Sequence, residues 1–301
     1  MYTRYCRSVL CTPATSIERY VKCHRSGADI CLVDLEDSVS VRRKEEARRQ
    51  AAGFFSPMDD APRRCAVRIN SVTEADGLRD LLAIQHYPVK PPIVLMPKVE
   101  SPRDVEIVEQ VLRPSCPQVE LFAILETPRG VENAAQIARA SDRLRALIFG
   151  AADYAALLGI DVDWEPLSYV RARLVNGART ADIHVIDSPT FDLADTVLVR
   201  QEAELAQAMG FSGKIALNPA QVTVINKVFS PSLEQLERAA RIVDAAERSA
   251  DDVTTVDGGM IGRPFFEASR RLLDEFWTPG DAEHAHRVPM LAAEPGTRRH
   301  R

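Results

Sequence analysis

Eight short apolar runs, each the length of a β-strand, alternate along this chain with longer amphipathic segments. Continuous apolar runs of this kind are typical of parallel strands that are buried on both faces. The predicted strands are Ser8–Cys11, Ile30–Leu35, Cys65–Asn70, Ile93–Lys98, Val119–Glu126, Leu144–Gly150, Ile183–Asp187 and Lys214–Asn218. The predicted helices lie near residues 16–26, 40–53, 73–85, 102–112, 128–140, 164–178, 192–209 and 219–228. This alternation predicts an α/β fold, a (β/α)8 TIM barrel with a C-terminal helical lid segment.

The chain length of 301 residues is sufficient for one barrel of about 250 residues. A doubly wound open sheet is the alternative, but such a sheet usually has fewer strands and a glycine-rich first turn, which this chain lacks. We expect the catalytic barrel over residues 1–250, the lid over 251–277 and a disordered tail over 278–301. Two further helices are expected, at Pro231–Ser249 and Phe265–Trp277. The segment 250–262 between them is rich in Asp and Gly and is expected to be a hinge.

The composition excludes several classes of protein. The net charge of -5 offers no basic surface for nucleic acid, and no run approaches the roughly 18 to 20 apolar residues of a membrane span. The first residues lack an apolar signal core, so we expect a cytoplasmic protein. The six cysteines include no CxxC pair, which disfavours a structural zinc site or a disulfide framework.

Charged residues stand where the predicted strands end, and in a barrel those ends converge on one face. Glu126 and Asp153 are two such carboxylates, and small residues precede the second. Two oxygen ligands without a nearby histidine or cysteine suit Mg²⁺, which keeps several water or substrate oxygens. The alternative is that both are helix caps or surface charges. The full set is Asp34, Glu36, Asp37, Arg68, Lys98, Glu126, Asp153 and Asp187.

Arg68 lies among apolar neighbours, so its strand is expected to be buried and its guanidinium to need a carboxylate. That carboxylate belongs either to a substrate acid, held by two parallel hydrogen bonds, or to one of the acids at 34, 36 and 37. Both arrangements can hold at once. Lys98 raises a different possibility, because a lysine at a barrel strand end can form a Schiff base.

Taken in order, the motifs of the chain resemble those of the citrate lyase β-subunit and malyl-CoA lyase family. The resemblance extends over about residues 5–275. It implies a (β/α)8 barrel, usually a homotrimer or hexamer, that uses Mg²⁺ to cleave or form a carbon–carbon bond in 3-hydroxyacyl thioesters. The motifs are Arg7-Ser8-Val9-Leu10 with Pro13, Leu35-Glu36-Asp37-Ser38-Val39, Val67-Arg68-Ile69-Asn70, Met96-Pro97-Lys98-Val99-Glu100, Glu126-Thr127, Phe149-Gly150-Ala151-Ala152-Asp153 and Phe229-Ser230-Pro231-Ser232.

The resemblance also implies roles for individual residues. Glu126 and Asp153 correspond to the metal ligands, and Arg68 corresponds to a clamp on the 2-oxo acid. The remaining correspondences are catalytic Glu36 and Asp37, which would hold metal-bound waters, substrate-binding Ala151 and Ala152, and contacts to coenzyme A at Arg19, Lys22 and Asn218.

Two positions depart from the family pattern. The family often has His-Pro where this chain has Asn218-Pro219, and it usually has an Asp in the lid where this chain has Gly262. Asp257, five residues earlier, is the candidate to substitute for it. The expected activity is Mg²⁺-dependent cleavage of a thioester, on coenzyme A or an acyl carrier protein, to a 2-oxo acid and an acyl thioester. The alternatives are a 2-oxo acid aldolase without coenzyme A, a catalytically impaired thioester-binding homologue, and a Schiff-base aldolase.

Overall fold

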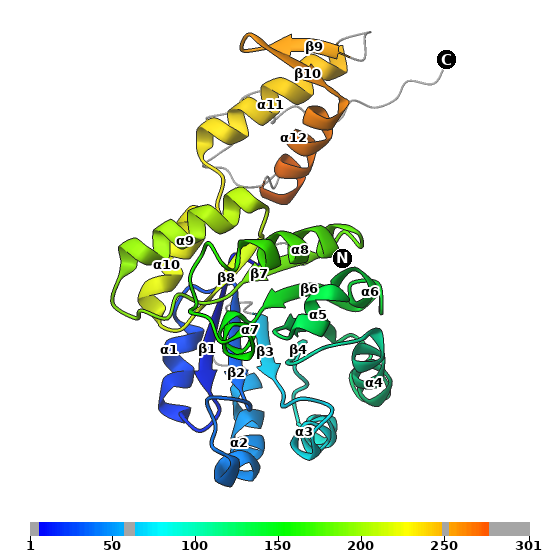
Figure 1. Cartoon of the computed structure of the whole chain (residues 1–301), viewed down its shortest axis with the longest axis vertical. Helices are drawn as coiled ribbons and strands as arrows, with labels where there is room; N and C mark the ends of the chain where they lie inside the picture. The colour runs from blue at the N-terminus through cyan, green and yellow to red at the C-terminus, as the bar shows by residue number, and fades with distance from the viewer. Residues whose placement is uncertain (1–5, 57–63, 249–252, 277–301) are drawn as a thin grey trace. The chain divides into compact units, whose positions relative to one another are not determined.

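Eight parallel strands close into a barrel in the order of the sequence, with the last strand hydrogen-bonded to the first (Figure 1). The computed structural model describes residues 6–56, 64–248 and 253–276. The (β/α)8 prediction is confirmed, and each predicted strand overlaps a strand of the barrel. The strands are β1 (Ser8–Pro13), β2 (Ile30–Asp34), β3 (Arg64–Arg68), β4 (Ile93–Met96), β5 (Glu120–Leu125), β6 (Leu144–Phe149), β7 (His184–Asp187) and β8 (Gly213–Ala216).

Helices follow the strands and surround the barrel. As predicted, α4 and α5 begin at Pro102 and Pro128, where proline needs no amide partner. The helix α7 was not predicted. The barrel's helices and 3₁₀ turns are η1 (Ile17–Arg19), α1 (Tyr20–His24), η2 (Val41–Arg43), α2 (Lys44–Ala51), η3 (Ala52–Phe55), α3 (Ala75–His86), α4 (Pro102–Leu112), α5 (Pro128–Glu132), α6 (Ala134–Ile137), α7 (Ala151–Leu158), α8 (Ser168–Arg179), α9 (Thr196–Met209) and α10 (Pro219–Val228).

The apolar core has two layers, as expected for strands that are buried on both faces. One cluster fills the inside of the barrel and includes Ile30, Leu95 and Phe122. The larger cluster lies between the strands and the helices and includes Val33 and Leu81. Burial of each such side chain stabilises the fold by about 1.5–3 kcal/mol. Two packed layers therefore hold the carboxyl ends of the strands in fixed positions.

The strand register places charged residues opposite one another. Asp34 at the end of β2 pairs with Arg68 at the end of β3. Asp187 at the end of β7 likewise pairs with Lys214 of β8. Opposite charges on neighbouring strands attract, so the register predicts an ion pair at each position.

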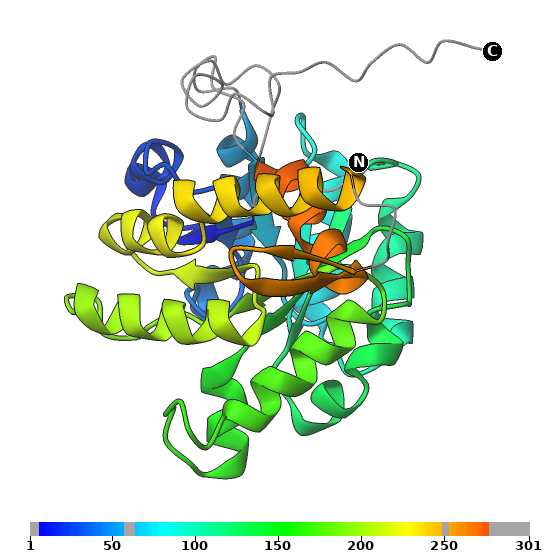
Figure 2. The same cartoon turned by 90° about the horizontal axis from the view of Figure 1, so that it is seen from above.

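A second compact unit begins at Ser230. It contains α11 (Leu233–Arg248), β9 (Val253–Val256), β10 (Gly259–Gly262) and α12 (Arg263–Phe276). The hairpin β9–β10 packs on α11 and α12, and Figure 2 shows these elements in yellow and orange. The observed boundary therefore precedes Ser230 and differs from the expected one at residue 250, because α11 packs with α12 in one unit.

The expected hinge at 250–262 is wrong for the part that the structure describes. Residues 253–262 form an antiparallel hairpin whose two-residue turn is Asp257-Gly258. Both turn residues have positive φ, 51° and 78°, as a type I′ turn requires. The expected tail at 278–301 lies outside the described residues. None of the described helices is both long and apolar enough to cross a membrane.

Candidate active site

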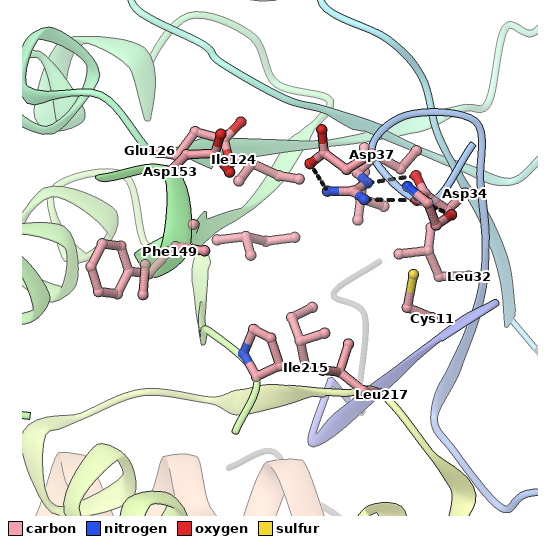
Figure 3. A pocket seen from close by; sticks show the side chains of 18 of the residues that line it. Cys11, Leu32, Asp34, Asp37, Ile124, Glu126, Phe149, Asp153, Ile215 and Leu217 are labelled. Atoms are coloured by element: carbon pink, nitrogen blue, oxygen red, sulfur yellow. Dashed lines mark hydrogen bonds and ion pairs between the residues drawn. The ribbon is translucent and has the colours of Figure 1, made fainter. Parts of the chain in front are cut away.

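A cavity of about 390 Å³ lies at the carboxyl ends of the barrel strands. Charged side chains line two parts of it: Asp34 and Asp37 lie on one side, and Glu126 and Asp153 lie together on another (Figure 3). The rest of the lining is largely apolar. Active sites of this fold are built at this face of the barrel.

Asp34 binds Arg68 across the register of β2 and β3. Arg68 donates from Nε and Nη2 to the two carboxylate oxygens, at 2.6 and 2.7 Å. Burial alone would raise the pKa of Asp34, but the charge and hydrogen bonds of Arg68 lower it below its ordinary value. The internal ion pair expected for Arg68 therefore exists. Nη1 pairs with Glu36 and Asp37, so the second Nη2 proton is the donor left for a substrate carboxylate, and the substrate contact stays a prediction.

Glu36 is buried and lies between two cations. Its carboxylate oxygens are 3.0 Å from Nη1 of Arg68 and 3.2 Å from Nζ of Lys98. Arg68 also lies 3.4 Å from the exposed carboxylate of Asp37. Burial raises the pKa of Glu36 to about 7; Asp37 also raises it, whereas Arg68 and Lys98 oppose the shift. The two cations thus allow three neighbouring acids at the end of β2.

Lys98 does not have the properties of a Schiff-base lysine. Burial lowers its pKa, but the neighbouring Glu36 carboxylate outweighs this effect, so the pKa of Lys98 is raised. A nucleophilic lysine needs a lowered pKa, since only the neutral amine attacks a carbonyl. The structure therefore argues against the Schiff-base alternative.

Glu126 follows β5 and is held from two directions. Its Oε1 accepts a hydrogen bond of 2.7 Å from the backbone N–H of Lys98, a residue in the left-handed region with φ of 52°. On the other side it faces Gly150, which follows β6, where Leu125 pairs with Phe149. A Cβ at Gly150 would lie 2.3 Å from Oε2 of Glu126, so only glycine permits this approach.

The environment of Glu126 is unfavourable for its negative charge when no cation is bound. Burial raises the pKa of Glu126 to about 8, and the charges of Glu36 and Asp153 add to the increase. A bound cation would relieve this repulsion. Glu126 thus has the position and the environment of a metal ligand.

The sequence suggested that Asp153 lies at a strand end. In the structure it lies in the first turn of α7, the helix that follows β6. Its carboxylate lines the cavity beside Glu126 (Figure 3). Ala151 and Ala152 also line the cavity, and the first backbone N–H groups of a helix have no acceptor within it. This turn therefore brings together a carboxylate and amide donors.

The donor set fits Mg²⁺. Within the described residues, Asp, Glu, His and Cys side chains form no group of three that could hold a metal. Two carboxylates, Glu126 and Asp153, are nevertheless sufficient for Mg²⁺, which is commonly bound by one or two carboxylates together with waters and substrate oxygens. Zinc would require a fuller set of nitrogen or sulfur ligands.

The expected coenzyme A contacts lie away from the carboxylates. Arg19 and Lys22 are exposed on η1 and α1, and neither lines the cavity. The side chain of Asn218 caps α10: it accepts from the N–H of Gln221 at 3.1 Å and donates to the carbonyl of Leu193 at 2.7 Å. The geometry thus gives Asn218 a structural task.

Asp187 belongs to a buried ion cluster that sequence reasoning did not predict. It binds Nζ of Lys214 and Nε of Arg171, each at 2.9 Å. The guanidinium of Arg171 also lies 4.1 Å from the ring centre of Trp164. A lysine within a strand run was the available signal, because a buried lysine needs an acid. Asp187 therefore neutralises two buried cations, and it does not line the cavity.

Comparisons with known proteins agree with this architecture. The family model described as HpcH/HpaI aldolase/citrate lyase matches residues 7–219. The chain is 30% identical over 283 residues to citrate lyase subunit beta of Escherichia coli strain K12, which covers 90% of this chain and 93% of that protein. It is 33% identical over 273 residues to the (3S)-malyl-CoA thioesterase of Cereibacter sphaeroides, covering 89% and 93%.

Solved structures give the same result. The CitE protein of Mycobacterium tuberculosis, solved in complex with magnesium, acetoacetate and coenzyme A, superposes with a TM-score of 0.76 at 29% identity. The match covers 92% of this chain and all of that one. The barrel, the paired carboxylates at its carboxyl face and these similarities over most of the chain lead to one assignment. The protein belongs to the HpcH/HpaI aldolase/citrate lyase family.

Proposed function

We propose that this chain is a Mg²⁺-dependent carbon–carbon lyase. Its substrate would be a 3-hydroxyacyl thioester of coenzyme A, which it cleaves to a 2-oxo acid and an acyl thioester or forms in the reverse direction. The observation that carries the proposal is the pair Glu126 and Asp153, buried and half-buried at the carboxyl face without a third protein ligand in the described residues. Such a pair leaves coordination positions for a chelating substrate.

The residues of the site have separate tasks in this proposal. Glu126 and Asp153 would hold the metal, which when bound stabilises negative charge on the substrate oxygen that becomes the ketone. The remaining Nη2 proton of Arg68 and the amides of Ala151 and Ala152 would hold the carboxylate of the 2-oxo acid half. Holding both groups fixes the scissile bond relative to the metal.

Glu36 and Asp37 support this arrangement from the other side of the cavity. Their carboxylates neutralise Arg68 and Lys98, at 3.0 to 3.4 Å. We propose that these two carboxylates also accept hydrogen bonds from waters bound to the metal, because a metal ion makes the protons of its waters more acidic. Arg19 and Lys22 are exposed, so they are available to phosphate groups of coenzyme A.

Gly262 favours a second candidate, a thioester-binding homologue with impaired lyase activity. Gly262 ends β10 and offers no group for proton transfer. Asp257 does not replace it, since its carboxylate lies at the hairpin turn and binds Arg241 at 2.8 Å. Family members are lyases or, in the relative from Cereibacter sphaeroides, a thioesterase, so hydrolysis is a third outcome to measure.

One assay separates these candidates. The full chain is incubated with malyl-CoA or citramalyl-CoA and Mg²⁺, and free thiol, acyl-CoA and 2-oxo acid are measured separately. Lyase activity releases 2-oxo acid and acyl-CoA in equal amounts and stops when a chelator is added. Release of free thiol alone would identify a thioesterase, and thioester binding without turnover would identify the impaired homologue. Light scattering tests the expected trimer or hexamer.

A further inference from the structure

The charges that line the cavity are unequal in number. Among the described residues, four carboxylates line it, and Arg68 is the one cation that does. Nε and Nη2 of Arg68 already bind Asp34, at 2.6 and 2.7 Å, and Nη1 pairs with Glu36 and Asp37, at 3.0 and 3.4 Å. Lys98 lies close by, but its Nζ pairs with Glu36, and its side chain is not part of the lining. The described cavity therefore has capacity for one substrate carboxylate.

The rest of the cavity wall is apolar. Phe149, Phe191, Ile215 and Leu217 come from β6, from β8 and from the loops after β7 and β8. Figure 3 shows Ile215 and Leu217 below the carboxylates in that view, apart from Glu126 and Asp153. No described side chain in this part of the lining is charged. A substrate group that reaches this wall loses water and gains apolar contacts.

These two observations bear on which 2-oxo acid the site accepts, an inference that depends on the proposed function. The oxo and carboxylate groups of the substrate would occupy the metal, the remaining Nη2 proton of Arg68 and the first amides of α7. The third substituent is then directed to the apolar wall, where a second carboxylate would be desolvated without a cation. We propose that the site selects 2-oxo acids whose third substituent is uncharged and apolar, and that it discriminates against 2-oxo diacids.

Matched ligand pairs test this selectivity directly. Calorimetry of the full chain with Mg²⁺ compares 2-oxobutyrate with oxaloacetate, which differ only in a terminal methyl or carboxylate. Because oxaloacetate loses carbon dioxide in the presence of divalent metals, 2-oxovalerate and 2-oxoglutarate provide a stable second pair. The expected result is at least about tenfold tighter binding of the monoacid in both pairs, which corresponds to about 1.4 kcal/mol.

A charge placed in the apolar wall should change the selectivity. Leu217→Lys is expected to raise the affinity for 2-oxoglutarate at least about fivefold relative to 2-oxovalerate, whereas the neutral control Leu217→Met should retain the wild-type ratio. The half-exposed Phe191 offers a second position if the first variant does not fold. There, Phe191→Arg is compared with Phe191→Leu in the same way.

The outcomes distinguish this inference from the function on which it depends. Tighter binding of the monoacids, with a ratio that falls only in the cationic variants, supports the inference. Equal or tighter binding of the diacids by the wild type overturns it and leaves the proposed function intact. If no 2-oxo acid binds in the presence of Mg²⁺, both the proposed function and the inference fail.

Discussion

Replacement of Gly150 by alanine tests whether the position of Glu126 matters for the site. The added Cβ would lie 2.3 Å from Oε2 and 2.5 Å from Cβ of Glu126, whereas real Cβ contacts are at least 3.0 Å. The oxygen must therefore move by at least about 0.7 Å. Rotation of the side chain cannot relieve the second contact, because the Cβ of Glu126 is attached to the backbone. The end of β5 must move as well.

The size of the effect follows from this displacement. Functional groups tolerate about 0.5 Å of misplacement, and a shift of about 1 Å can reduce the rate about 100-fold. We therefore expect Gly150→Ala to reduce thioester turnover by about 100-fold and to weaken Mg²⁺ binding. The overpacked contact should also destabilise the fold by about 1–3 kcal/mol.

The assay combines turnover, calorimetry of Mg²⁺ and urea unfolding for the variant and a matched control. Gly53→Ala is that control, because a Cβ at Gly53 meets nothing within 4 Å. It should leave turnover and Mg²⁺ affinity unchanged. A Gly150→Ala protein with wild-type turnover and Mg²⁺ affinity would refute the argument that the close approach of Gly150 fixes the ligand.

Three further variants test other parts of the site. Arg68→Lys should weaken 2-oxo acid binding about 100-fold, because an ammonium cannot bind Asp34 and a substrate carboxylate in the planar geometry of a guanidinium; near-wild-type affinity in calorimetry would contradict this role. Asp34→Asn should destabilise the protein at neutral pH by about 3–5 kcal/mol. Because the folded pKa of Asp34 is lowered, its contribution to stability is complete above the unfolded pKa of about 3.9 and is lost as pH falls through the lower folded value. The difference in free energy of unfolding between the variant and the wild type should therefore narrow below about pH 4 in urea unfolding. A difference that stays constant with pH would contradict this. Gly262→Asp should raise deuterium exchange into acetyl-CoA, because it adds a carboxylate that can exchange a proton. The side chain has space, since a Cβ at this position meets only Pro264, at 3.9 Å. Rapid wild-type cleavage without any gain in the variant would show that another residue supplies the proton.

The barrel was predictable because its strands are apolar on both faces and end in charged residues. The same argument placed Arg68 near the acids after β2. It could not identify the partner, since Asp34, Glu36 and Asp37 were equally available in the sequence. The register of β2 and β3 places Asp34 beside Arg68 and gives it the two-bond contact, whereas Glu36 and Asp37 both contact Nη1.

Two local elements were missed although the sequence contains signals for them. The helix α7 is only eight residues long, and its end is marked by Gly159 in the left-handed region, with φ of 68°. The hairpin turn Asp257-Gly258 is a common turn dipeptide, but the strands beside it are only four residues long and only partly buried. Weak apolar periodicity therefore hid both elements.

The supporting contacts of the site were beyond sequence reasoning for a different reason. The hydrogen bond to Glu126 comes from the backbone of Lys98, a lysine with positive φ, and no residue pattern indicates such a conformation or such a contact. The contact between Gly150 and Glu126 depends on the pairing of β5 with β6. Such contacts follow from tertiary geometry and not from residue type.

The central claim is that Glu126 and Asp153 together bind one Mg²⁺ and so allow a 2-oxo acid to bind. Calorimetry of Mg²⁺ and then of pyruvate should compare the wild type with Glu126→Gln, Asp153→Asn and the exposed control Asp161→Asn. Loss of an outer partner of a metal ligand typically costs 10–100-fold in affinity, so loss of a ligand charge should cost at least about 100-fold. We predict that both site variants lose Mg²⁺ and Mg²⁺-dependent pyruvate binding while the control retains them. Wild-type Mg²⁺ affinity in both site variants would contradict the claim.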